Sequence, residues 1–144
     1  MKLFFLCAMS MLLLVPVAGA ESGSTKKLTP QTQNGVELVS GGVGGREQAA
    51  LDKMDEKYNV RVTISNSRGA YLSGVDLSIE TDAGKRLVEH TLRGPILLAK
   101  LDSGRYVLQA RGEGRMTERR VFDVPKDPKD QVRIFITLAK KAAE

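Results

Sequence analysis

The chain offers one side chain that could act as a general base near neutral pH, the imidazole of its single histidine, His90. A catalytic triad or a cysteine–histidine pair needs such a base beside a nucleophile, and a histidine metal site needs a second imidazole. His90 lies between Glu89 and Thr91 in an alternating stretch, with Val88 and Leu92 on its own side. We therefore interpret His90 as a structural strand histidine.

Carboxylates are more numerous, but their spacing suits neither hydrolysis nor calcium binding. Asp76 and Glu80 are four residues apart in a predicted strand, which separates them by about 13 Å, too far for a two-carboxylate site within one strand. Asp52, Asp55 and Glu56 fall in a predicted helix and lack the alternating aspartates and glycine of a calcium loop. We interpret both groups as solvated faces. The sequence thus predicts no enzyme, no cofactor and no metal.

Arginines form the charged group with the clearest spatial pattern, because four of them lie opposite the apolar side of a predicted strand. They are Arg61, Arg105, Arg111 and Arg133. Neighbouring strands could join them into a cationic contact face for an acidic partner, a lipid head group or an anionic glycan. The alternative, which we favour, is neutralisation by Glu113, Glu118 and the Asp76 strand as cross-strand pairs. Nucleic acid is disfavoured, because aromatic residues for stacking make up 5% of the chain.

The first twenty residues have the composition of a secretory signal. Lys2 is followed by an apolar run over residues 3–17 and by small residues at Ala18 and Ala20, the order of a cleavable leader. A bilayer span needs about 20 apolar residues, so we predict that residues 1–20 are removed and that no stable membrane span remains. Loss of Cys7 would leave a mature chain without cysteine. We expect it to be periplasmic or secreted.

Two segments connect this leader to the rest of the chain. Residues 21–45 are rich in glycine and small polar residues without a sustained period, which is typical of a flexible tether. Residues 46–57 favour one short helix, in which Leu51, Met54 and Tyr58 form a narrow apolar stripe. Such a stripe does not stabilise an isolated helix, so we expect this helix to lie across the edge or end of the following domain.

From residue 58 the hydrophobic period changes to two. Val60, Val62 and Ile64 alternate with polar residues, and six further short runs follow up to residue 139, separated by turn signals. Each run has one apolar side that must be buried against another sheet. The predicted fold class is therefore all-β, a seven-stranded antiparallel β-sandwich over residues 58–139, preceded by the short helix. A closed barrel stays open as the alternative, because periodicity does not separate the two.

Several of these segments resemble the carboxypeptidase regulatory-like domain, a transthyretin-like (prealbumin-like) sandwich also found in small exported bacterial proteins. The resemblance covers residues 58–138 and includes Gly74-Val75, Gly94-Pro95 and the stretch Leu101-Asp102-Ser103-Gly104-Arg105-Tyr106-Val107-Leu108. Gly104 would occupy a tight turn that needs positive φ, and Tyr106 would enter the core with a hydroxyl that needs a partner.

The resemblance implies a binding, folding or spacing module without a catalytic centre. Transthyretin-like hydroxyisourate hydrolases share the fold class, but their several histidines and their C-terminal Tyr-Arg-Gly-Ser are absent from this chain. We therefore expect an exported non-enzymatic module that acts through protein or cell-envelope contacts. The alternatives are a binding protein for an anionic ligand or glycan on a cationic sheet face, and an accessory or inhibitor domain of an enzyme.

Overall fold

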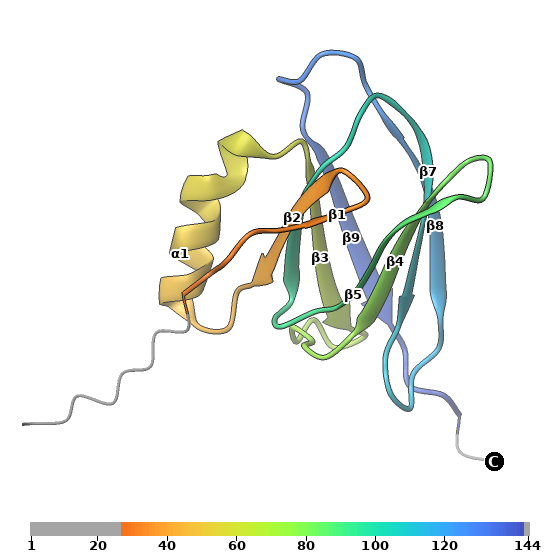
Figure 1. The fold of residues 1–144 in the computed structure, drawn as a ribbon. Coiled ribbons are helices and arrows are strands. Elements are labelled where there is room, and N and C mark those ends of the chain that lie inside the picture. Colours follow the sequence, from red (N-terminus) through yellow and green to blue (C-terminus); the bar gives the residue numbers. More distant parts are fainter. Residues whose placement is uncertain (1–26, 143–144) are drawn as a thin grey trace, which may run out of the picture.

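The computed structural model describes residues 27–142, and the expected leader over residues 1–20 lies outside this part of the chain. Two β-sheets face each other, and one helix covers the outer side of one of them (Figure 1). The elements in chain order are β1 (Gln31–Gln33), β2 (Val36–Gly41), α1 (Gly45–Met54), the 3₁₀ turn η1 (Asp55–Lys57), β3 (Val60–Asn66), β4 (Asp76–Thr81), β5 (Arg86–Thr91), β6 (Ile96–Lys100), β7 (Gly104–Arg111), β8 (Glu118–Val124) and β9 (Val132–Leu138).

The strands form two sheets of different composition. Sheet A has the order β1-β2-β6-β3-β9, and sheet B has the order β5-β4-β7-β8. The two-sheet, mostly-β architecture with one short helix confirms the coarse prediction. The prediction of seven antiparallel strands is wrong, because β1 and β2 join sheet A and because β3 and β9 run parallel from Val60↔Val132 to Asn66↔Leu138. Hydrophobic periodicity identifies a strand and its buried side, but it says nothing about the direction of its neighbour.

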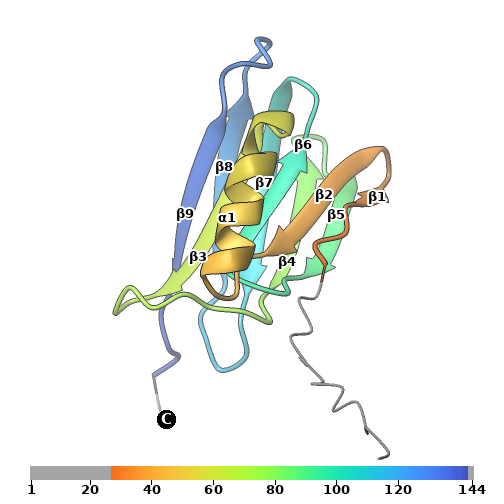
Figure 2. The ribbon, with the colours of Figure 1, turned by 90° about the vertical axis from the view of Figure 1, so that its left-hand side faces the viewer.

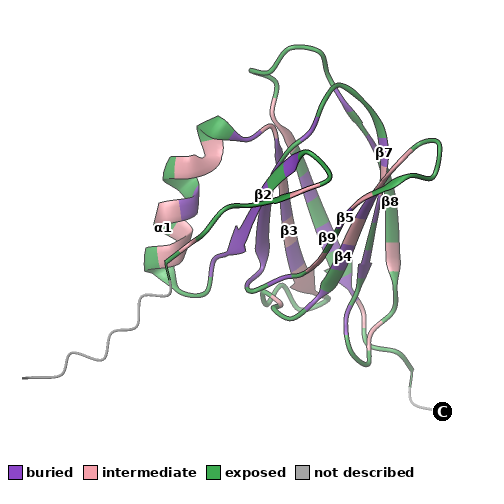
Figure 3. Cartoon of the chain, in the orientation of Figure 1, coloured by how far each residue is buried: buried purple, intermediate pink, exposed green. Residues whose placement is uncertain are grey.

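The core lies between the two sheets and follows the alternation read from the sequence. On β3, Val60, Val62 and Ile64 have exposed fractions of 0%. Leu77 and Leu108 meet them from sheet B with exposed fractions of 1% and 0%. The buried cluster draws on both sheets, and along most strands buried positions alternate with intermediate or exposed ones (Figure 3). Burial of apolar surface is therefore the main force that joins the sheets.

The flexible tether expected over residues 21–45 is wrong for the part that forms β1 and β2. Asn34 and Gly35 have φ angles of 47° and 78°, the left-handed pair of a two-residue hairpin turn. β2 then pairs antiparallel with β6 from Glu37↔Lys100 to Gly41↔Ile96. The Asn-Gly signal was present in the sequence, but the polar composition of β1 concealed it.

Helix α1 confirms the short helix predicted over residues 46–57, with η1 completing its last turn. Its position differs from the prediction, since it lies across the outer face of sheet A and not at an edge or end (Figure 2). Leu51 and Tyr58 pack there with Val39, Ile96 and Leu98 in a second hydrophobic cluster. The run Ile96–Ala99 is consequently buried throughout, because β6 is covered on both faces.

The connection from β2 to α1 needs a close approach of two backbones. A Cβ on Gly94 would overlap the backbone carbonyl of Gly41. Past this contact, the carboxylate of Glu47 accepts the N–H groups of Gly42 and Val43 at 3.0 and 3.1 Å. The glycine-rich residues 41–45, expected to be part of the flexible tether, thus form a tight connection held by the first turn of α1.

The sandwich is closed along the side where the β1–β2 hairpin meets β5. The side-chain amide of Asn34 donates to the carbonyl of Leu87 at 3.0 Å, and the side-chain carbonyl of Gln33 accepts the N–H of Glu89 at 3.0 Å. These amides take the place that a neighbouring strand would have on β5. No helix among residues 27–142 is long and apolar enough to cross a membrane.

Candidate protein-contact site

His90 lies on the inner side of β5, where it joins the two sheets. Its Nε2 is 2.8 Å from the Oγ of Ser40 on β2, and that same Oγ accepts the N–H of Arg93 at 3.3 Å. Burial lowers the pKa of His90, and the positive charge of Arg93 lowers it further. The hydrogen bond between Ser40 Oγ and His90 Nε2 therefore links β2 to β5.

A serine beside a histidine is the first requirement of an acyl-transfer site. Ser40, however, is 7% exposed and lies at the junction of the sheets. Among the described residues no carboxylate hydrogen-bonds His90 to orient it as a base. The Ser40–His90 pair thus has the geometry of a structural link between β2 and β5.

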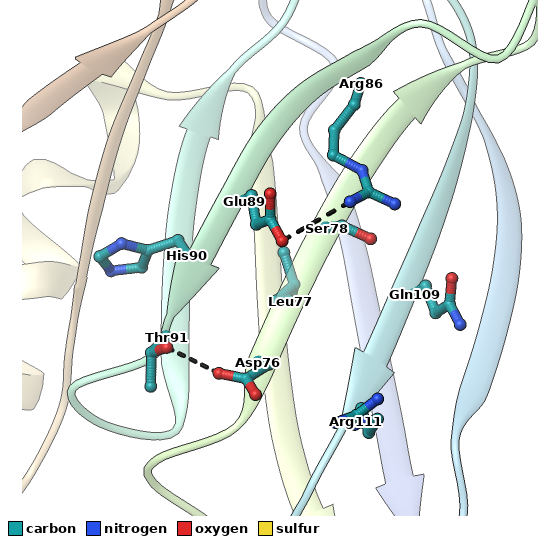
Figure 4. Close-up of a pocket in the computed structure, with 9 residues that line it drawn as sticks. All are labelled: Asp76, Leu77, Ser78, Arg86, Glu89, His90, Thr91, Gln109 and Arg111. Carbon is teal, nitrogen blue, oxygen red and sulfur yellow. Dashed lines mark hydrogen bonds and ion pairs between the residues drawn. The ribbon is translucent and has the colours of Figure 1, made fainter.

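The outer face of sheet B carries a shallow polar hollow of about 390 Å³ (Figure 4). Its charged groups are largely engaged: the carboxylate of Asp76 accepts the hydroxyl of Thr91 at 2.6 Å, and Arg86 contacts Glu89 at 3.5 Å. His90 points away from Asp76 and Arg111 in this view, toward β2. His90 is among the residues that line the hollow, but its ring is hydrogen-bonded to Ser40 on β2 and is not directed at Asp76 or Arg111.

The four arginines of the expected cationic face do not share a face. Arg61 and Arg133 are register neighbours on β3 and β9 of sheet A. Arg105 and Arg111 lie on β7 of sheet B. A single contact face over all four is therefore a wrong expectation, because outward residues of the two sheets point in opposite directions.

Three of these arginines are neutralised by ion pairs. Arg61 contacts Asp52 at 2.9 Å and Asp55 at 3.2 Å, and Arg133 contacts Asp55 at 3.1 Å. Arg105 contacts Asp123 at 2.8 Å, and this hydrogen bond lowers the pKa of the Asp123 carboxyl. Sequence reasoning expected pairing but named other acids, because the contact of α1 with sheet A was not foreseen.

Arg111 differs from the other three. Within residues 27–142 it makes no ion pair, although Asp76 lies opposite it in the β4–β7 register. One arginine beside Asp76, Glu89 and Arg86 does not make an anion site. In the same part of the chain, no group of three or more histidine, cysteine, aspartate or glutamate residues could hold a metal ion.

The motif around Gly104 and Tyr106 stabilises the turn between β6 and β7. Gly104 has a φ of 152°, and the Tyr106 hydroxyl donates to the carbonyl of Asp102 at 2.7 Å. The Tyr106 ring stacks on Phe122 with a centroid distance of 5.7 Å. The pKa of Tyr106 is raised by burial and then by the charge of Asp102. Tyr106 therefore ties the β6–β7 turn to the core.

The edge of sheet A formed by β9 was missed by sequence reasoning. The N–H of Val132 donates to the carbonyl of Asn59 at 2.8 Å, so Val132 turns its backbone groups toward β3. Alternation along a parallel strand then turns the backbone groups of Arg133, Phe135 and Thr137 away from β3. Among the described residues β9 has no other strand partner, so these groups are open.

Two large aromatic side chains, one on β9 and one in the segment after β3, are exposed on sheet A. Phe135 is 66% exposed and Tyr71 is 60% exposed. Phe135 lies opposite Thr63 of β3, whereas Tyr71 is bridged to Ser65 on the β6 side of the same strand. Both aromatic residues border, with α1, a hollow of about 420 Å³. We call Thr63, Tyr71, Arg133, Phe135 and Thr137 the β9 surface. An open strand edge can pair with a strand of another chain, and exposed aromatic residues are common in protein–protein interfaces.

Comparisons with known proteins add little to this geometry. No family model and no curated protein matches the sequence. Among solved structures, BcpA, the major pilin subunit of Bacillus cereus, is 15% identical over 57% of this chain and 28% of its own, with a TM-score of 0.45. The TIE protein of Bacillus anthracis is 16% identical over 56% of this chain and 17% of its own, with a TM-score of 0.48. The chain spans less than a third of either protein, and similarity at this level carries no functional conclusion.

Proposed function

We propose that this chain is an exported, non-enzymatic β-sandwich module that binds a protein component of the cell envelope through the β9 surface. The observation that carries the proposal is the open edge at Arg133, Phe135 and Thr137, with Phe135 66% exposed beside it. Export rests on the leader-like composition of residues 1–20.

Two of the four edge strands, β5 and β9, differ in how their outer edges are covered. The edge of β5 is occupied by the side-chain amides of Gln33 and Asn34. The edge of β9 is covered at its end, where the N–H of Met116 donates to the carbonyl of Ala139 at 2.9 Å. Between Val132 and Ala139 the edge is open. An extended segment could add there as a further strand, with backbone hydrogen bonds giving affinity and side chains giving selectivity.

The competing function, binding of an anionic ligand or glycan through a cationic face, has less support. Arg61, Arg105 and Arg133 are neutralised by the aspartates described above, and the fourth arginine lies among acidic residues. Salt would weaken such binding strongly, whereas a strand addition depends mainly on backbone bonds and apolar burial.

We also propose that the chain belongs with the carboxypeptidase regulatory-like, transthyretin-like domains. The two-sheet architecture and the geometry of Gly104 and Tyr106 support this placement. A periplasmic or secreted location is part of the same proposal. The resemblance adds the expectation of a binding module, and the β9 surface supplies the place where binding would occur.

Photo-crosslinking in the native cell envelope tests the proposed function. A photoreactive phenylalanine analogue replaces Phe135 in one variant and Val121 in a matched control, since Val121 is 50% exposed on the outer face of sheet B. We expect a discrete protein adduct from position 135 and none from position 121. Equal adducts from both positions, or none from position 135, would refute the β9 surface as the contact site.

A further inference from the structure

The open edge of β9 has a self-complementary geometry. We propose that the strand it accepts is β9 of a second copy of this chain, in antiparallel register about a two-fold axis at Phe135. The inference rests on the proposed function of the β9 surface and names its partner. It would join sheet A of both copies into one continuous sheet.

The limits of the open edge select this axis. β9 begins at Val132, and just past its other end the carbonyl of Ala139 accepts the N–H of Met116 on the outer edge. The outward backbone groups between these limits belong to Arg133, Phe135 and Thr137, and Phe135 is their midpoint. A two-fold axis at the midpoint pairs the whole open edge of one copy with the whole open edge of the other.

In this register, the N–H and carbonyl groups of one β9 edge face carbonyl and N–H groups of the other along its whole length. Phe135 lies opposite Phe135 of the other copy, and Arg133 lies opposite Thr137, twice. All of these residues turn their N–H and carbonyl groups toward the partner, so each becomes a hydrogen-bonded antiparallel pair. Three such pairs give about six backbone hydrogen bonds.

The side chains favour the same register. The two Phe135 rings would lie side by side on the outer face and cover surface that is 66% exposed in the single chain. Arg133 would keep its ion pair with Asp55 and face an uncharged Thr137. A register centred on Arg133 would instead place two arginines opposite each other and leave Phe135 exposed, which disfavours it.

Sedimentation of the full exported chain at increasing concentration tests the inference. We expect a reversible monomer–dimer equilibrium. Phe135→Lys and Phe135→Glu each place like charges opposite each other on the axis, so each variant alone should be monomeric at least tenfold above the concentration at which the parent is half dimeric. An equimolar mixture of the two should dimerise again, because lysine then faces glutamate.

Val121→Lys is the matched control, since it adds the same charge to an exposed strand position outside the β9 surface and should dimerise like the parent. Thr137→Pro is a second variant, which removes an outward N–H without removing a bond to β3 and should also be monomeric. Thermal melts of all variants identify any that fail to fold, and the conclusion then rests on those that do fold.

A parent chain that stays monomeric at every concentration, or a mixture of the two charged variants that does not dimerise, overturns the inference. The crosslinking experiment tests the proposed function independently of dimer formation. If the parent is monomeric while position 135 still crosslinks another envelope protein, the β9 surface binds a different partner. If neither dimer nor adduct forms, both proposals fail.

Discussion

At the scale of single residues, His90 shows how a group suited to catalysis can serve the fold. Its imidazole is the only one in the chain, and it is hydrogen-bonded to the buried Ser40 across the two sheets. Burial and the nearby Arg93 keep it neutral by lowering its pKa. The structural interpretation of His90 therefore yields a prediction about pH.

The stability of the fold should fall as pH falls through the titration of His90. The unfolded histidine has a pKa of about 6.5, and the folded pKa is lower, so the unfolded state binds more protons below pH of about 6.5. The His90 contribution is thus fully present above that pH and is lost as pH falls toward the folded pKa. Urea unfolding between pH 7.5 and 5 measures it.

His90→Gln is the comparison for that measurement, because glutamine can hydrogen-bond Ser40 but does not titrate in this range. The difference in unfolding free energy between parent and variant should shrink as pH falls. A difference that is constant with pH would show that His90 is not desolvated in the way described.

Two substitutions of Tyr106 separate the contribution of its ring from that of its hydroxyl to the stability of the fold. Tyr106→Ala removes a buried ring that stacks on Phe122 and should cost about 3–5 kcal/mol. Tyr106→Phe keeps the ring and removes the hydroxyl bond to Asp102, so it should cost about 0.5–1.5 kcal/mol. Urea unfolding of both variants checks the order. Equal losses would mean that the ring contributes no packing.

At the scale of elements, helix α1 is held by the sheet that it covers. Leu51 is 0% exposed and packs with Ile96 and Leu98 of the central strand β6. Leu51→Ala should therefore destabilise the whole domain by about 2–5 kcal/mol, in one cooperative transition. Helix and tertiary signals should be followed together during denaturation. If the helix melts first and the sandwich keeps its parent stability, the helix is only loosely attached.

The elements were predictable where one local pattern decides them. The alternation of Val60, Val62 and Ile64 identified β3 and its buried side, and the stripe through Leu51 identified α1. The location of α1 was not predictable, because its narrow stripe fits an edge as well as a face. β1 was missed because its polar residues have no apolar side, and it exists through pairing with β2.

At the scale of the whole molecule, the arrangement of strands creates the candidate site. β9 is the last strand among residues 27–142 and pairs parallel with β3, which leaves its other edge at the boundary of sheet A. Hydrophobic periodicity does not indicate which strand lies at the edge of a sheet. The sequence therefore predicted a contact site from outward arginines and not from a strand edge. The structure separates those arginines onto two sheets and leaves the exposed Phe135 at the open edge.

Amide hydrogen exchange of the dilute chain, read at each residue of β9 by NMR, tests directly whether the outer edge of β9 is open. We expect the N–H groups of Arg133, Phe135 and Thr137 to exchange fast, while those of Ile134 and Ile136 are protected by β3. At high concentration, or with a crosslinked partner, the N–H of Phe135 should become protected. Protection of Phe135 equal to that of Ile136 in the dilute chain would show that the edge is already covered, which contradicts an open β9 edge.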